Sequence, residues 1–247
     1  MGLEGPSSSI VEKSRPGRVV AFGSLVDHAG GHLQNCNTLL AGHDENDHAD
    51  HQSDHQSDES SLAQQQHCSH VGDPHLWLDP TLMKQLVAGI DEHLTQRGAA
   101  PGAARVAAVL SRIDEADRLA GEVLADVAGG RLITQHDAWR RYAAAYDLQI
   151  LGSVLPAGVG QPTAGDMARA LDAIEMARQS SNLPIAIMTE PQLNPRVAQR
   201  VAQSAEVPLG VLEPLGDGDW FALHVRNARV IADTLTGYSS VAGISPP

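Results

Sequence analysis

The second half of the chain alternates short apolar runs with helical segments, and this alternation restricts the possible folds more than any other feature. Each short run ends near a polar or turn-forming residue, and a helical pattern follows it. The predicted strands are 131–134, 148–154, 184–190 and 208–215, and the predicted helices are 137–147, 163–180, 195–205 and 219–235. Four consecutive strand–helix units predict an α/β fold with a parallel sheet covered by helices.

Two helical segments precede these units. Residues 82–94 place apolar side chains on one helical face: Leu82, Leu86, Val87, Ile90 and Leu94. An Ala-rich segment begins at Pro101 and ends before Gly129, which predicts one long helix over 101–127. A helix of that length would span about 40 Å.

Polar side chains that can bind metal follow the predicted strands. His136 comes directly after the first strand, Glu190 ends the third, and Glu213 and Asp219 lie at or beyond the end of the fourth. In parallel sheets, ligands bind at the carboxyl ends of the strands. Imidazole together with carboxylate suits zinc or manganese. His75 lies before the long helices and is a further candidate.

The three Trp residues lie close to these candidates in the sequence. Trp77 is near His75, Trp139 is near His136, and Trp220 follows Asp219. Two interpretations stay open: the indole rings screen a site from water, or they only fill the space between layers.

Residues 43–70, called here the His-Asp tract, contain six His and seven acidic residues and no Lys or Arg. Its histidines are His43, His48, His51, His55, His67 and His70. Such a composition cannot bury enough apolar surface to order by itself. The tract is therefore interpreted as a loop that gathers metal weakly, or as a solvated loop with no required role.

The charge of the chain excludes some partners. The net charge is −13, and no Lys or Arg occurs between Arg18 and Lys84. Nucleic acid and anionic membrane surfaces attract basic patches, so neither is an expected partner. Two cysteines, Cys36 and Cys68, flank most of the tract, and whether they pair stays open.

Motifs for enzymatic chemistry are missing from the sequence. It has no GxGxxG, Walker, GxSxG or HExxH pattern. A metallohydrolase that uses Glu190 with His136 is a minor alternative. The start of the chain, MGLEGPSSSIVEKSRPG, has no apolar core of the kind found in secretory signals, and no transmembrane run occurs.

Four segments in order resemble the zinc/manganese substrate-binding proteins of ABC transporters. These are DPHLWLDP (73–80), ITQHDAW with AYDLQILG (133–152), TEPQLNP (189–195), and VLEPLG followed by GDW (211–220). The family also often carries a His-Asp-rich loop before its DPH segment. The resemblance implies two Rossmann-like lobes joined by a long helix, with the metal bound between them.

The same resemblance implies a ligand set. It assigns His75 and His136 as metal ligands and Asp219 as a further ligand, with Asp217 as a rival. It places Glu190 near the site, where it would support the ligands. Zn²⁺ is the expected cargo, Mn²⁺ is possible, and water or a histidine of the tract would complete the coordination.

The amino-terminal part departs from the family pattern. The strands of the family's amino-terminal lobe and the first metal-binding His of that lobe are not found in this sequence. The chain is therefore expected to lack part of the amino-terminal lobe. Neither His28 nor His32 lies in a context that replaces the missing ligand. The expected organisation is a remnant lobe with the tract (1–72), a connector (73–130) and a carboxyl-terminal lobe (131–247).

The function implied by the resemblance is a receptor that is not an enzyme. It would bind Zn²⁺ in the periplasm or at the cell surface and deliver it to a membrane permease. A full-length chain would be monomeric, and a truncated one would be prone to association. The alternatives are a zinc-buffering chaperone that acts through the His-Asp tract, and a manganese receptor.

Overall fold

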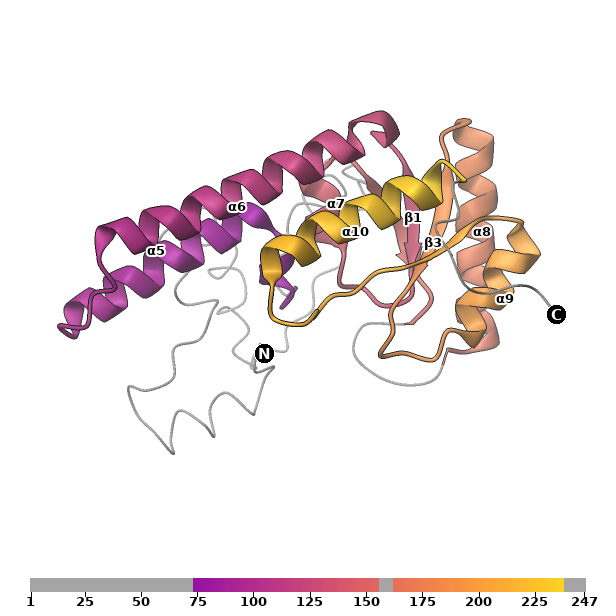
Figure 1. Cartoon of the computed structure of the whole chain (residues 1–247). Coiled ribbons are helices and arrows are strands. Elements are labelled where there is room, and N and C mark those ends of the chain that lie inside the picture. Colours follow the sequence, from indigo (N-terminus) through magenta and orange to yellow (C-terminus); the bar gives the residue numbers. More distant parts are fainter. Residues whose placement is uncertain (1–72, 156–161, 238–247) are drawn as a thin grey trace, which may run out of the picture.

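A four-stranded parallel sheet lies at the centre of the structure, a computed structural model that describes residues 73–155 and 162–237 (Figure 1). The strands are β1 (Arg131–Thr134), β2 (Gln149–Ser153), β3 (Ile185–Thr189) and β4 (Leu209–Val211). Their order is β2-β1-β3-β4, and every neighbouring pair is parallel. The predicted α/β class is confirmed.

Helices cover both faces of this sheet (Figure 1). The helical elements are η1 (Leu76–Leu78), α5 (Pro80–Gln96), α6 (Ala103–Leu124), η2 (Ala125–Val127), α7 (Arg140–Ala145), α8 (Ala164–Ser180), α9 (Arg196–Ala205) and α10 (Trp220–Leu235). In Figure 1, α8 and α9 lie at one side of the sheet, and α6 and α10 run side by side at the other. The helix α5 leads away from the sheet, and α6 returns to it.

Two hydrophobic clusters form the core, one on each face of the sheet. Successive residues of a strand point to opposite faces. Leu132 and Met188 accordingly pack with α6, α7 and α10, whereas their neighbours Ile133 and Ile187 pack with α8 and α9. Because both faces are covered, β1 and β3 are buried along their whole length, as continuous apolar runs predict.

Several predicted boundaries were wrong at the ends of elements. The long helix stops at Leu124 and continues as the 3-10 turn η2. The helix predicted over 137–147 begins only at Arg140, because the preceding residues form a turn. The fourth strand predicted over 208–215 ends at Val211. Ile90, one of the side chains on the predicted apolar face of 82–94, is 41% exposed.

The segment before α5 is fixed by a helix cap. Asp79 accepts hydrogen bonds from the backbone N–H groups of Thr81 (2.8 Å) and Leu82 (3.2 Å), and Pro80 occupies the first helical position. Both features favour the start of a helix at this point. Because η1 directly precedes the capping residue Asp79, the cap also helps to fix the position of the segment that carries His75.

Some sequence predictions lie outside the described residues. They include the His-Asp tract, Cys36, Cys68, His28 and His32. The division into 1–72, 73–130 and 131–247 stays a prediction. Among the helices of the described part, none combines the length and the apolar character that crossing a membrane requires.

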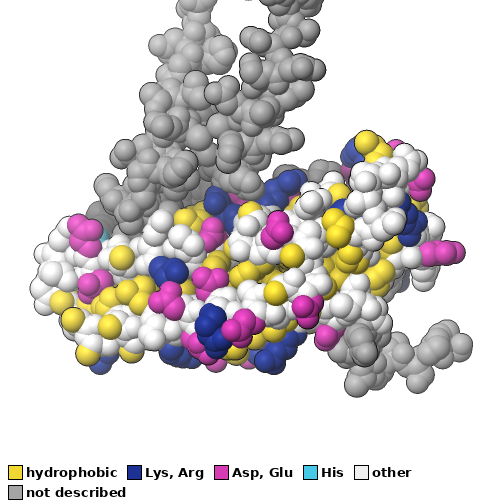
Figure 2. All heavy atoms as spheres, turned by 90° about the horizontal axis from the view of Figure 1, so that it is seen from above, with side chains coloured by type: hydrophobic (Ala, Val, Ile, Leu, Met, Phe, Trp, Pro, Cys, Tyr) yellow, Lys and Arg dark blue, Asp and Glu magenta, His cyan; other side chains and the backbone are white. Residues whose placement is uncertain are grey.

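The face of the molecule seen in Figure 2 carries both signs of charge. Acidic and basic side chains are interspersed over the described residues of this face, between apolar and uncharged ones. No broad basic patch is visible among the described residues of this face.

Strand β4 packs so closely under α10 that a methyl group would not fit at Gly210. An added Cβ would lie 2.5 Å from Thr234 Oγ1 and 2.8 Å from Met188 Sδ. Gly210→Ala is therefore expected to lower the free energy of unfolding by about 1–3 kcal/mol, as overpacking does. Urea denaturation measures it. Gly152→Ala on β2 is the control, because its Cβ would meet nothing within 4 Å; equal losses in both variants would contradict the packing argument.

Candidate metal site

The candidate site begins at the carboxyl ends of β1 and β3. The chain passes from β1 outward to β2 and then crosses back to β3, so the strand order reverses between β1 and β3. Such a switch point leaves a crevice beyond the strand ends, where ligands bind in α/β sheets. His136 follows β1 and Glu190 follows β3, so the two side chains flank this point.

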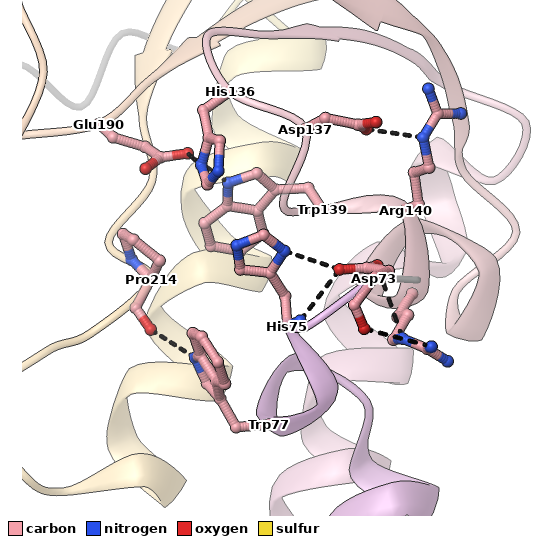
Figure 3. A network of polar contacts seen from close by, with 10 residues as sticks. Asp73, His75, Trp77, His136, Asp137, Trp139, Arg140, Glu190 and Pro214 are labelled. Atoms are coloured by element: carbon pink, nitrogen blue, oxygen red, sulfur yellow. Dashed lines mark hydrogen bonds and ion pairs between the residues drawn. The ribbon is translucent and has the colours of Figure 1, made fainter. Parts of the chain in front are cut away.

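The side chains of His136 and Glu190 lie close together (Figure 3). Nδ1 of His136 is 3.4 Å from Oε1 of Glu190. The same carboxylate oxygen accepts a hydrogen bond from the indole N–H of Trp139 at 3.0 Å. The backbone N–H of Glu190 donates to the side chain of Gln135 at 3.1 Å. Glu190 is only 5% exposed, so these contacts hold a buried carboxylate in place beside His136.

His75 approaches the same place from η1, more than fifty residues away in the sequence. Its ring contacts the ring of His136 edge to face, with 4.8 Å between the centroids. Its ring also lies 5.4 Å from that of Trp77. His75 is 7% exposed, whereas the side chain of His136 is 31% exposed. The pair therefore has one buried imidazole and one that reaches solvent.

Hydrogen bonds from two indole groups connect the segment of His75 to the part of the chain that follows β4. The indole N–H of Trp77 donates to the backbone carbonyl of Pro214 at 2.8 Å, just after β4 (Figure 3). In return, the indole N–H of Trp220 donates to the backbone carbonyl of Trp77 at 2.7 Å. These hydrogen bonds join η1 to the loop after β4 and to the first residue of α10. His75 and His136 consequently belong to one packed unit.

A buried carboxylate, Asp73, contacts His75. Oδ1 of Asp73 accepts from Nδ1 of His75 at 2.7 Å, and Nε of Arg141 lies 3.5 Å from Oδ2. Burial favours the neutral carboxyl, but the hydrogen bonds from the side chain and backbone of His75, with the charges of His75 and Arg141, outweigh it. The pKa of Asp73 is therefore lowered below its ordinary value. The carboxylate is the form that faces His75.

The contacts of Asp219 are with residues other than the two histidines of the candidate site. Its carboxylate caps α10 by accepting from the N–H of Ala222 at 3.2 Å, and it lies 3.9 Å from Arg112. Its rival Asp217 lies 3.8 Å from Arg226 and accepts from the N–H of Asp219. Neither carboxylate has a contact with His75 or His136 among those that the structure gives. The assignment of Asp219 as a ligand stays a prediction.

The donors brought together fit part of a zinc site. Zinc is bound in proteins mainly by imidazole nitrogen, thiolate and carboxylate oxygen, with four ligands at structural sites. His75 and His136 supply two imidazoles, with Glu190 and Asp73 beside them. Within 73–155 and 162–237, no group of three or more His, Cys, Asp or Glu is arranged to hold a metal ion. The described part therefore offers a two-histidine half-site.

Sequence reasoning missed Asp73 and Gln135. Asp73 had a local signal, since an Asp two residues before His75 forms a turn in which its side chain accepts from the backbone N–H of His75, at 2.9 Å. Gln135 had none: it joins the ends of β1 and β3 by donating to the carbonyl of Asn194 and accepting from Glu190. Only the order of the strands reveals that role.

Comparison with known proteins identifies the family of this chain. The family model described as the periplasmic component A of the zinc-uptake complex, ZnuA, matches residues 1–234. The chain belongs to this family. Its expected resemblance to zinc-type substrate-binding proteins of ABC transporters is thereby confirmed.

Curated relatives of this ZnuA-family chain are high-affinity zinc uptake system proteins. The one from Brucella suis is 27% identical over 173 residues, which cover 66% of this chain and 50% of the relative. The one from Haemophilus ducreyi is 29% identical over 147 residues, 58% of this chain and 46% of the relative. The chain thus spans about half the length of the curated relatives it matches.

Solved structures show the same fold. A crystal structure of ZnuA matches with a TM-score of 0.57 and 24% identity, covering 67% of this chain and 63% of the other. The periplasmic zinc-binding protein TroA from Treponema pallidum matches with a TM-score of 0.54 and 22% identity, covering 66% and 64%. A substrate-binding protein from Pseudomonas aeruginosa, solved with Mn²⁺, has a TM-score of 0.55 and 19% identity, covering 66% and 61%.

Proposed function

We propose that the chain is a periplasmic receptor that binds Zn²⁺ and delivers it to the permease of an ABC-type uptake system. The observation that carries this proposal is the contact between the rings of His75 and His136, 4.8 Å apart, with a buried carboxylate beside each. Membership of the zinc-uptake family supports the same function. Capture and release of an ion neither make nor break a covalent bond, so the receptor is not an enzyme.

Zinc is the favoured cargo because of the donor types. Imidazole suits zinc, whereas manganese prefers carboxylate and carbonyl oxygen. Two imidazoles in direct contact, one of them buried, favour the more nitrogen-rich coordination. We therefore expect Mn²⁺ to bind more weakly than Zn²⁺.

The remaining coordination positions need donors beyond this pair. Asp219 is the proposed third ligand, with Asp217 as its rival, and either would have to leave the contacts described above. Water or a histidine of the His-Asp tract would complete the set. In this scheme the tract gathers Zn²⁺ weakly near the site, while His75 and His136 hold it.

Titration of the full chain with Zn²⁺ tests the proposal. We expect one tight equivalent, accompanied by a change in intrinsic Trp fluorescence, because the ring of Trp77 lies 5.4 Å from that of His75. Calorimetry gives the stoichiometry and fluorescence reports the surroundings of the indoles. A titration with Mn²⁺ alone should give a weaker transition.

A variant lacking residues 43–70 serves as the control for the tract. It should lose the weak equivalents and keep the tight one with its fluorescence change. Loss of the tight equivalent in this deletion would instead favour a zinc-buffering protein that works through the His-Asp tract. Tighter binding of Mn²⁺ than of Zn²⁺ would identify a manganese receptor.

A further inference from the structure

Asp73 contacts His75 through its carboxylate and is not among the ligands expected from the sequence. Its Oδ1 accepts two hydrogen bonds from His75, one from Nδ1 at 2.7 Å and one from the backbone N–H at 2.9 Å. The side chains of both residues are almost completely buried, 7% exposed for Asp73 and 8% for His75. The carboxylate therefore fixes both the backbone turn and the imidazole ring of the same residue (Figure 3).

A second contact ties Asp73 to the segment that carries His136. Arg141 lies on α7, five residues after His136, and its Nε is 3.5 Å from Oδ2 of Asp73. Another guanidinium nitrogen of Arg141 donates to the backbone carbonyl of Asp73 at 3.5 Å. The segment of His75 and the segment of His136 are thus joined through Asp73 as well as through the ring contact.

The hydrogen bond to Asp73 determines which nitrogen of His75 can bind metal. A carboxylate only accepts hydrogen bonds, so Nδ1 of His75 must carry the proton. The lone pair is then on Nε2. Carboxylates that bind the second nitrogen of a metal-ligating His fix its tautomer and ring orientation in this way.

We propose that Asp73 is the positioning residue for His75, holding its ring in place with Nε2 as the metal-binding nitrogen, while Arg141 holds the carboxylate. This inference rests on the proposed function, because it assigns His75 as a ligand. It adds a requirement that the ligand set alone does not contain: His75 needs an acceptor at Nδ1 before any metal arrives.

The test uses Asp73→Ala and Asp73→Asn in the full chain. In metal-free protein labelled with ¹⁵N at histidine, long-range ¹H–¹⁵N spectra report which nitrogen of His75 is protonated. Wild type should show the proton on Nδ1. Asp73→Ala should show a mixture, whereas Asp73→Asn, which keeps a carbonyl oxygen as acceptor, should largely restore the wild-type tautomer.

Zinc affinity provides the second measurement. Asp73→Ala should weaken Zn²⁺ binding by about 10–100-fold, the usual cost of losing a partner of a metal ligand, and Asp73→Asn by less. Asp114→Ala is the matched control, because it also removes one carboxylate and an ion pair, here with Lys84 on an exposed surface. It should leave both measurements unchanged.

The two proposals fail in different ways. An unchanged tautomer of His75 in Asp73→Ala overturns the positioning role even when wild type binds one Zn²⁺ tightly. An unchanged zinc affinity in Asp73→Ala with an altered tautomer overturns it as well. A tight zinc equivalent whose affinity is unchanged in His75→Ala overturns the proposed function, whatever the spectra of the Asp73 variants show.

Discussion

Replacing both His75 and His136 with alanine is expected to abolish the tight binding of Zn²⁺. Each substitution removes an imidazole donor, and the remaining carboxylates, Glu190 and Asp73, are left without the nitrogen ligands that zinc favours. The loss of affinity should exceed the roughly 10–100-fold cost of removing an outer partner of a ligand. Competition titration against a zinc-binding dye measures it, and each single variant should show an intermediate loss.

His93→Ala is the control for the double variant. His93 lies on α5 outside the half-site, so its removal takes away one imidazole without touching the pair. Its tight equivalent should match that of wild type. Retention of the tight equivalent in the double variant, together with its loss when residues 43–70 are deleted, would transfer the function to the His-Asp tract.

The second large effect concerns the stability of the fold in acid. His224 of α10 is buried, and its ring stacks on that of Trp220 with 4.6 Å between centroids. The hydroxyl of Tyr146 donates to Asp117 at 2.9 Å, so it accepts from Nε2 of His224, 2.6 Å away. Burial lowers the pKa of His224 from 6.5 to about 4. The folded protein thus keeps this ring neutral.

The direction of the pH dependence follows from that shift. Between pH 6.5 and about 4 the unfolded chain binds a proton at His224 that the folded protein does not, so stability falls as the pH is lowered through this range. The lowered pKa corresponds to a loss of about 3 kcal/mol, complete below the folded pKa. Urea denaturation of metal-free protein across this range measures the loss.

Comparison of two variants isolates the contribution of His224. His224→Phe removes the titrating group, so its stability should depend less steeply on pH between 6.5 and 4. Tyr142→Phe removes the hydroxyl that donates to the backbone carbonyl of His224 at 2.8 Å, without removing a group that titrates in this range. Tyr142→Phe should lower the free energy of unfolding, and the slope of that free energy against pH should match the wild-type slope. Identical slopes in wild type and His224→Phe would contradict the assignment.

The sheet and most of its helices could be predicted because their signals are local. Buried parallel strands are short apolar runs, and 131–134 and 184–190 agree with β1 and β3 to within one residue at each end. Element ends were less predictable. The fourth strand is short because Leu212 is the last residue to bond to β3 before Glu213 and Pro214 turn the chain, and the side chain of Glu213 accepts from the N–H groups that follow.

The site was predictable in its residue types and not in its contacts. Strand-end reasoning selected His136 and Glu190. His75 was a further candidate from its place before the long helices, and the resemblance then assigned it as a ligand. Asp219 was chosen for the same edge, yet the contacts that the structure gives it are those of a helix cap and a neighbour of Arg112. An Asp before a helix has a capping role available in any context, and the sequence alone does not separate that role from metal binding.

The sequence by itself determined the periodicities: apolar runs for the strands, amphipathic patterns for the helices, and imidazoles and carboxylates next to strand ends. Tertiary structure decided which of these side chains contact one another. The order β2-β1-β3-β4 brings His136 beside Glu190, and the indole hydrogen bonds of Trp77 and Trp220 bring His75 to His136. Periodicity depends on residues a few positions apart, whereas these contacts depend on how separate elements pack, which no local pattern encodes.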